Sequence, residues 1–176
     1  MSDYFSLFKK INTVVLDVDG VLTNSQMLIT EQGEFLRSMS VRDGYALKRS
    51  MMHGLRLCVI TGGSSKGVEI RLKKLGIPHI FSGVQKKMEV FENWSEMHSI
   101  ALDKTLYMGD DLPDAEVMMA VGCPVCPADA DPFIREISKY VSPVKGGEGC
   151  VRDVLEKVLK LQGGWKSIKK VGTGAD

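Results

Sequence analysis

Residues 12–20, with the sequence NTVVLDVDG, join a short apolar run to two closely spaced carboxylates. The run from Thr13 to Leu16 is continuously apolar or β-branched, which is typical of a strand buried on both faces of a sheet. Asp17 and Asp19 follow at once, and side chains two positions apart along an extended segment point the same way. The stretch therefore predicts a buried strand whose carboxyl end presents two acids to one ligand.

The rest of the chain alternates predicted strands with predicted helices. Four further apolar runs predict strands, at residues 55–60, 77–81, 105–108 and 122–126. Apolar residues at helical spacing predict helices, at about residues 43–53, 64–75, 87–97, 113–120 and 151–161. Two short segments, 27–30 and 34–37, flank a turn-like sequence and predict a small β-hairpin flap at about 24–40. We therefore expect an α/β fold, with a Rossmann-like parallel sheet and helices on both faces.

The composition fits one globular unit and gives no sign of a polyanionic partner. The chain has 176 residues, 44% of them hydrophobic, which suffices for one core. Its 23 basic and 22 acidic side chains give a net charge of +1, so no overall field favours nucleic acid or an anionic membrane. The first ten residues lack the apolar stretch of a signal peptide, and no segment is long enough to span a bilayer. We expect a cytoplasmic protein without nucleic-acid or membrane partners.

The cysteines are expected to be free thiols, at positions Cys58, Cys123, Cys126 and Cys150. Cys123 and Cys126 have the spacing of a redox or zinc motif. The chain has no second such pair, and no histidine lies near them in sequence. We therefore interpret this segment as a buried strand that contains two small apolar thiols.

Polar residues concentrate where the predicted strands end. In chain order they are Asp17 and Asp19, Thr61 and Gly62, Lys86 and Lys87, and Asp110, Asp111 and Asp114. Each is commonplace alone as a turn, cap or surface residue, but ligands of open α/β sheets bind at the carboxyl ends of the strands, where these groups converge. Crowded carboxylates repel unless a cation joins them, and their hard oxygens suit Mg²⁺. A hydroxyl, glycine amides and an ammonium group suit a phosphoryl group, so the set predicts phosphoryl transfer.

Four motifs in this order carry a resemblance to a known family, at residues 17–23, 59–62, 87 and 108–111 with Asp114. They resemble the motifs of the haloacid dehalogenase superfamily and span most of the chain. Further matches resemble the small capless phosphatases that act on 3-deoxy-D-manno-octulosonate 8-phosphate, at residues 41–45, 68–71 and 146–152. The resemblance implies one haloacid dehalogenase-like domain over residues 1–162 without a separate cap domain. Residues 163–176 are polar, basic and contain glycine, so we expect a flexible C-terminal tail.

The resemblance implies a role for each residue of the site. Asp17 would be the nucleophile, Asp19 would protonate the leaving alcohol and later activate water, and Lys87 rather than Lys86 would offset the charge of Asp17 and the phosphate. The ligands of magnesium would be Asp17, the backbone carbonyl of Asp19, and Asp110. The groups that support the metal waters or the lysine would be Asp111 or Asp114. The phosphoryl oxygens would be held by Thr61 and the amide of Gly62.

The substrate implied by the resemblance is a small sugar phosphate that also carries a carboxylate. Arg71 and Lys74 lie three apart on one predicted helix face and could bind that carboxylate together, and Arg42 is another candidate. Octulosonate phosphatases tend to carry arginine directly after the Thr-Gly pair, where this chain has Gly63. A sialic-acid-type 9-phosphate is therefore an alternative substrate to the octulosonate, whose release would place the enzyme in lipopolysaccharide biosynthesis.

The lack of a cap predicts an oligomer, because an open site leaves water in competition with every electrostatic contact. The resemblance implies a homotetramer in which the hairpins assemble and the C-terminal tail reaches the site of a neighbour. The interface residues on the hairpin would be Met27, Leu28, Ile29, Phe35 and Leu36.

Two other functions use similar residues. A receiver-like phosphorylation switch also combines a phosphorylated aspartate with nearby acids, threonine and lysine, but its acid pair precedes the phosphorylated residue, whereas Asp17 and Asp19 come first here. A phosphomutase on the same scaffold would have to retain its product for return transfer, and the missing cap argues against this. The sequence therefore favours a phosphatase.

Overall fold

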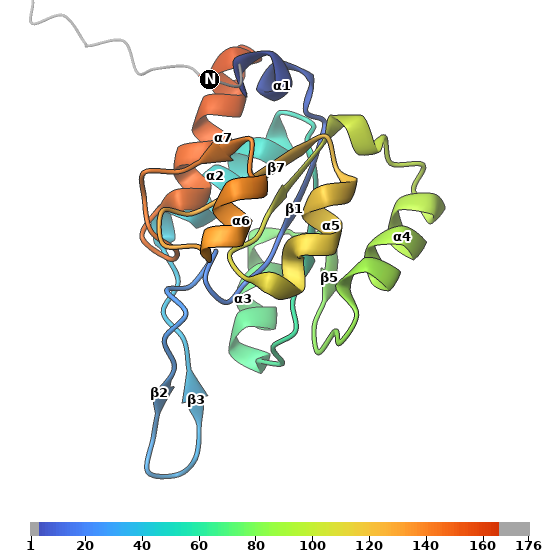
Figure 1. Ribbon diagram of the computed structural model, residues 1–176. Coiled ribbons are helices and arrows are strands. Elements are labelled where there is room, and N and C mark those ends of the chain that lie inside the picture. Colours follow the sequence, from blue (N-terminus) through green and yellow to red (C-terminus); the bar gives the residue numbers. More distant parts are fainter. Residues whose placement is uncertain (1–3, 166–176) are drawn as a thin grey trace, which may run out of the picture.

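The molecule is built on a six-stranded parallel sheet (Figure 1). The computed structural model describes residues 4–165, and within them the strands lie in the order β5-β4-β1-β6-β7-β8. Their bounds are β1 Thr13–Leu16, β4 Arg56–Ile60, β5 His79–Phe81, β6 Thr105–Met108, β7 Cys123–Cys126 and β8 Tyr140–Val141. All neighbouring strands are parallel, and Leu16 at the end of β1 lies level with Val59 and Met108. The carboxyl ends of β1, β4 and β6 therefore meet at one edge.

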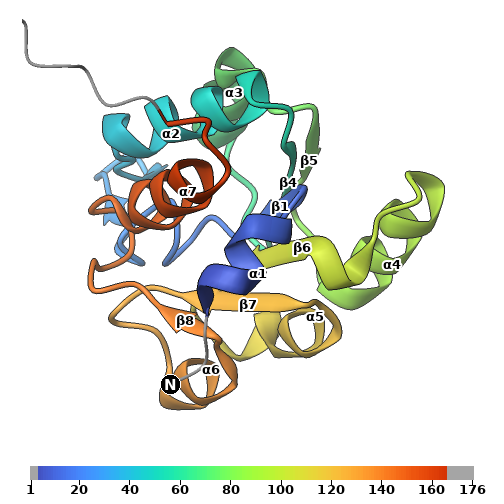
Figure 2. The same ribbon diagram turned by 90° about the horizontal axis from the view of Figure 1, so that it is seen from above.

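Helices cover both faces of this sheet (Figure 2). Their bounds are α1 Tyr4–Lys10, α2 Val41–Met52, α3 Lys66–Leu75, α4 Lys87–Met97, α5 Ala115–Ala120, α6 Pro132–Ile137 and α7 Cys150–Leu161, with short 3-10 helices η1 Leu102–Lys104 and η2 Leu112–Asp114. Val14 and Leu16 join the core under α1, α2, α3 and α7, and Val15 joins the core under α4, α5 and α6. Side chains alternate along a strand, so all four residues of β1 are buried. The predicted α/β fold is confirmed.

Local signals set the helix bounds closely. The hydroxyl of Ser65 accepts a hydrogen bond from Val68 N at the start of α3, and Gly76 ends that helix with φ +90°. Ser40 caps α2 in the same way by accepting from Asp43 N. The helix α4 has the predicted bounds Lys87–Met97, with Phe91 and Trp94 buried.

The sequence pattern does not predict α1, α6 or β8. Each is short, with 7, 6 and 2 residues, so apolar periodicity has too little length to show. A capping signal is nevertheless present for α6, because Asp131 accepts a hydrogen bond from Phe133 N and Pro132 occupies the first turn. The sheet consequently has one strand more than the five expected from the apolar runs.

The predicted hairpin projects from the body below the sheet (Figure 1). Its strands, β2 Leu28–Ile29 and β3 Phe35–Leu36, are antiparallel and shorter than the predicted segments. Their apolar side chains are exposed, with Leu28 at 67% and Phe35 at 58%. In the described residues no other segment is inserted between β1 and α2, so the prediction of a hairpin without a separate cap domain is confirmed.

The four cysteines are buried free thiols. Cys123 belongs to the core on one face of the sheet and Cys126 to the core on the other. Both lie on β7 three residues apart, so their side chains point to opposite faces. They cannot bind one metal ion together, and burial raises the pKa of Cys123 to about 12. The interpretation of this segment as a buried strand is confirmed.

The start of the predicted tail is packed on the body. Backbone N–H groups of Gly164 and Trp165 donate to Leu159 O, and the guanidinium of Arg152 lies 4.3 Å from the centre of the Trp165 ring. The remainder of the predicted tail, 166–176, lies outside the described residues. Among the helices of residues 4–165, none combines the length and the apolar content that crossing a membrane requires.

Candidate active site

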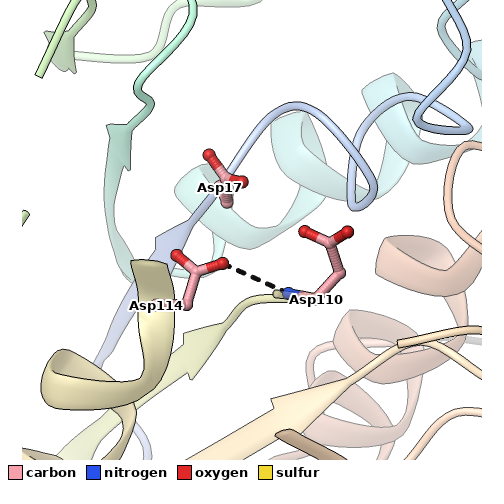
Figure 3. Close-up of side chains that lie close together, drawn as sticks. All are labelled: Asp17, Asp110 and Asp114. Carbon is pink, nitrogen blue, oxygen red and sulfur yellow. Dashed lines mark hydrogen bonds between the residues drawn. The ribbon is translucent and has the colours of Figure 1, made fainter. Parts of the chain in front are cut away.

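Three aspartates meet at the carboxyl edge of the sheet (Figure 3). Asp17 directly follows β1, Asp110 follows β6 after one glycine, and Asp114 ends η2. One carboxylate oxygen from each lies within 4.8 Å of the others. Asp17 is 6% exposed and Asp114 only 1% exposed. The convergence predicted from the strand ends is therefore present.

Lys87, the first residue of α4, contacts two of these three aspartates. Its Nζ lies 2.7 Å from Asp114 Oδ1 and 3.1 Å from Asp17 Oδ1, and its side chain is buried. Burial lowers the pKa of Lys87, but the carboxylates of Asp17 and Asp114 outweigh burial and the net shift is upward. Lys87 therefore remains a buried cation beside Asp17, while the neighbouring Lys86 pairs with Glu89 at the surface.

Asp114 is held by hydrogen bonds on both of its oxygens. Oδ1 accepts from Lys87 Nζ and from the hydroxyl of Tyr107 at 2.6 Å, and Oδ2 accepts from Asp110 N at 3.2 Å. These contacts orient Lys87 and the loop after β6. Asp111, in contrast, is exposed, and its carboxylate accepts from Leu112 N. Of the two candidate supporting acids, Asp114 is thus the one that contacts the lysine.

The free oxygens of the cluster fit a hard divalent cation. Asp110 Oδ1 is buried without a hydrogen-bond partner, and Asp17 Oδ1 faces Lys87 outside hydrogen-bond geometry. Burial and the Asp114 carboxylate raise the pKa of Asp17 to about 6, and burial and the Asp17 carboxylate raise that of Asp110 to about 7. An ion between them would relieve this repulsion and complete the bonds of both oxygens. Carboxylate oxygens of this kind are the ligands that Mg²⁺ prefers.

Gly20 makes room for the side chain of Asp110. It has φ +91°, and a Cβ atom placed on it would lie 1.8 Å from Asp110 Oδ2. A side chain here would therefore be strained and would also displace Asp110. The glycine of the DVDG sequence thus allows the loop after β1 to approach the loop after β6.

Asp19 lines the same cleft as the three acids and is paired with an arginine of the hairpin. Its Oδ1 accepts from Arg37 Nε at 2.7 Å and its Oδ2 from Arg37 Nη2 at 3.1 Å. Arg37 comes directly after β3, and its side chain is only 7% exposed. The sequence reasoning missed Arg37. No spacing or periodicity in the sequence links Arg37 to the loop after β1.

Thr61 and Gly62 line the same cleft as the acids. Thr61 follows β4, is buried, and accepts a hydrogen bond on Oγ1 from Gly63 N at 3.2 Å. The cleft also contains the carboxylates of Asp17 and Asp110 and the ammonium group of Lys87. The structure therefore brings together the nucleophile, metal and phosphate residues that the sequence predicts.

The predicted carboxylate-binding cations are spread over different places. Arg71 lines a groove between α3 and the hairpin, and a Cβ on Gly44 would lie 2.7 Å from its Nη2. Lys74 is exposed on α3 and does not line this groove, and Arg42 is exposed in the first turn of α2. The joint binding of a carboxylate by Arg71 and Lys74 stays a prediction.

Comparison with known proteins gives a consistent result, although no family model matches the sequence. The 3-deoxy-D-manno-octulosonate 8-phosphate phosphatase KdsC of Escherichia coli K12 is 37% identical over 162 residues, which cover 92% of this chain and 86% of that protein. The crystal structure of the phosphatase of this name from Moraxella catarrhalis, in complex with a magnesium ion, a phosphate ion and KDO, has a TM-score of 0.89 at 33% identity. That alignment covers 93% of this chain and 94% of the other.

A third relative, from Legionella pneumophila, is assigned to the HAD (haloacid dehalogenase) superfamily, subfamily III A. It has a TM-score of 0.88 at 32% identity and covers 90% of this chain and 87% of its own. The sequence motifs, the sheet topology and these three relatives agree. The chain therefore belongs to the family of 3-deoxy-D-manno-octulosonate 8-phosphate phosphatases, within the haloacid dehalogenase superfamily.

Proposed function

We propose that this phosphatase hydrolyses a phosphomonoester with the help of magnesium and through an aspartyl-phosphate on Asp17. The observation that carries the proposal is the position of the Asp17 carboxylate. Its Oδ1 lies 3.1 Å from the Lys87 ammonium group, and the carboxylate belongs to one cluster with Asp110, whose Oδ1 has no hydrogen-bond partner. A bound magnesium ion, held by Asp17, Asp110 and the backbone carbonyl of Asp19, would offset the charge of the phosphoryl oxygens.

The chain supplies the groups for two successive displacements. In the first, an oxygen of Asp17 forms a bond to phosphorus while the bond from phosphorus to the leaving oxygen breaks, and Asp19 gives that oxygen a proton. In the second, Asp19 takes a proton from water as the water oxygen attacks phosphorus. Asp17 is then released as a carboxylate together with inorganic phosphate. Lys87 keeps its proton throughout, and Thr61 and Gly62 orient the phosphoryl group.

The proposed substrate is 3-deoxy-D-manno-octulosonate 8-phosphate, on the strength of the names of the relatives. Its hydrolysis would place the enzyme in lipopolysaccharide biosynthesis, in the cytoplasm. A sialic-acid-type 9-phosphate is the alternative, because Gly63 offers no side chain to the sugar acid. Comparing kcat/KM for the two sugar-acid phosphates decides between them.

The proposed quaternary state is a homotetramer assembled through the hairpins. The supporting observation is that the hairpin exposes a set of large apolar side chains, which are Met27, Leu28, Ile29, Phe35 and Leu36. Apolar surface of this kind on a projecting element marks a protein contact. The resemblance further implies that the C-terminal tail reaches a neighbouring site.

Asp17→Asn tests the mechanism. An amide is a poor nucleophile, so kcat should fall by at least roughly 1,000-fold while the fold and its melting temperature are kept. Asp103→Asn, at the opposite end of β6, is the matched control and should retain activity. Substantial activity in Asp17→Asn would show that another group attacks phosphorus. A single stable phosphoryl group per chain in the parent enzyme, instead of repeated turnover, would contradict hydrolysis.

A further inference from the structure

The guanidinium of Arg37 lies at the junction of two hollows. The catalytic cleft shares Asp19, Thr61 and Gly63 with a small hollow that Arg37 also lines, and this hollow shares Arg37, Ser65 and Val68 with the groove between α3 and the hairpin. Asp17 and Lys87 line the cleft and not the groove, whereas Arg37 lines the groove and not the cleft. A substrate that extends from Asp17 past Asp19 toward the groove would bring its far end to Arg37.

Arg37 is buried, but only some of its N–H donors are bonded within the described residues. Its side chain is 7% exposed, and in residues 4–165 its hydrogen bonds all go to Asp19, from Nε and from Nη2. A guanidinium has five N–H donors, so Nη1 and one hydrogen of Nη2 remain available. Two parallel N–H groups of this kind match the two oxygens of a carboxylate. The geometry leaves a preformed place for a second anion on Arg37.

The space beside this guanidinium is kept open by Gly63. A Cβ on Gly63 would lie 3.2 Å from Arg37 Nη2 and 2.7 Å from Asp19 Oδ2. Any side chain at this position would therefore press on the ion pair. The absence of a side chain at position 63 therefore leaves room for the Arg37 and Asp19 pair beside the Thr61 loop.

We propose that Arg37 determines the specificity of this enzyme by binding the carboxylate of a sugar-acid phosphate. This inference rests on the proposed function. Arg37 keeps its Nε contact to Asp19 and receives the substrate carboxylate on Nη1 and Nη2. The residue that recognises the far end of the substrate thus also orients the acid and base of the reaction. Arg37 is on the hairpin, so the element that lacks a packing partner in the single chain is tied to the site through this pair.

The test compares two phosphates of primary alcohols, 3-deoxy-D-manno-octulosonate 8-phosphate and a pentose 5-phosphate, which has no carboxylate. The ratio of their kcat/KM values should favour the sugar acid in the parent enzyme. In Arg37→Ala this ratio should fall by roughly 10- to 100-fold, the usual worth of a hydrogen bond to a charged group, chiefly through KM of the sugar acid. Any loss of Asp19 orientation lowers kcat for both substrates and cancels in the ratio. Arg37→Lys should give an intermediate ratio, because it keeps the charge and loses the paired donors.

Lys48→Ala is the matched control, because it removes one positive charge from an exposed position on α2 and should leave the ratio unchanged. A binding measurement gives a readout without chemistry. In calorimetry the dephosphorylated sugar acid should bind the parent more tightly than Arg37→Ala, and a polyol of similar size without a carboxylate should bind both alike. Circular dichroism checks the fold, and if Arg37→Ala does not fold, Arg37→Lys decides.

Three results would overturn the proposal, and they differ in what they contradict. If the parent enzyme prefers the sugar acid and Arg37→Ala keeps that preference, Arg37 is not the specificity residue and the proposed substrate stands. If Arg71→Ala, and not Arg37→Ala, removes the preference, the carboxylate binds on α3. If the parent enzyme shows no preference for the sugar acid, the proposed substrate and the role of Arg37 both fall.

Discussion

At the scale of single residues, the chemistry of the site depends on how closely two loops approach each other. Gly20 has φ +91°, and Asp110 Oδ2 occupies the space where a Cβ would be, only 1.8 Å away. Gly54 has φ +98° and no atom within 4 Å of the same position. The two glycines therefore separate the effect of backbone strain from the effect of crowding at Asp110.

We predict that Gly20→Ala weakens magnesium binding and lowers kcat/KM at least about 10-fold, since Asp110 must move away from Asp17. Gly54→Ala should cost a similar backbone strain of roughly 1–2 kcal/mol without any change in activity. Magnesium titrations by calorimetry and by activity check both variants. Equal loss of activity in the two variants would mean that strain alone matters and that Gly20 has no special relation to Asp110.

At the scale of elements, the hairpin of β2 and β3 is the part least explained by the single chain. Its strands have two residues each, it projects from the body, and Leu28 and Phe35 are more than half exposed. An isolated two-stranded ribbon is marginally stable in water, so its apolar side chains need a partner.

We predict that Phe35→Glu lowers the solution mass from that of a tetramer toward the 19.4 kDa of one chain, because a buried unpaired charge opposes assembly. Met97→Glu, which changes a 79% exposed side chain at the end of α4, is the matched control and should leave the mass unchanged. Light scattering at micromolar concentration measures both. A parent protein that is itself monomeric would contradict assembly through the hairpins.

The elements also show how much a sequence of this kind can predict. The central strands and α4 could be predicted, because each has an apolar run or stripe and a clear boundary residue. The strand β8 and the helix α1 could not, because two and seven residues are too few for a periodic pattern, and packing on the rest of the core forms them.

The site was predictable in part for a similar physical reason. Residues at strand ends, such as Asp17 and Asp110, could be predicted because parallel strands bring their carboxyl ends together. Arg37 could not, because its approach to Asp19 depends on the path of an irregular segment between the hairpin and α2. The joint role of Arg71 and Lys74 stays a prediction; Arg71 lies beside Gly44, and Lys74 is exposed.

At the scale of the whole molecule, the fold brings charged side chains from distant parts of the sequence to one edge of the sheet. Strands β1, β4 and β6 bring an acid pair, a threonine and a second acidic loop to one edge, and α4 adds Lys87. The balance of charge is local, because the chain as a whole has a net charge of only +1. Binding of an anionic substrate must therefore come from this edge and from a bound cation rather than from the overall field.

The central claim is that Asp17 attacks phosphorus while sharing a divalent cation with Asp110. A crystal structure with magnesium and trifluoroberyllate, which mimics a phosphoryl group, tests it most directly. We predict beryllium bonded to an oxygen of Asp17, and one magnesium ion bound by Asp17 and Asp110. A fluoroberyllate group bonded elsewhere, or Asp17 and Asp110 without a shared ion, would contradict the account.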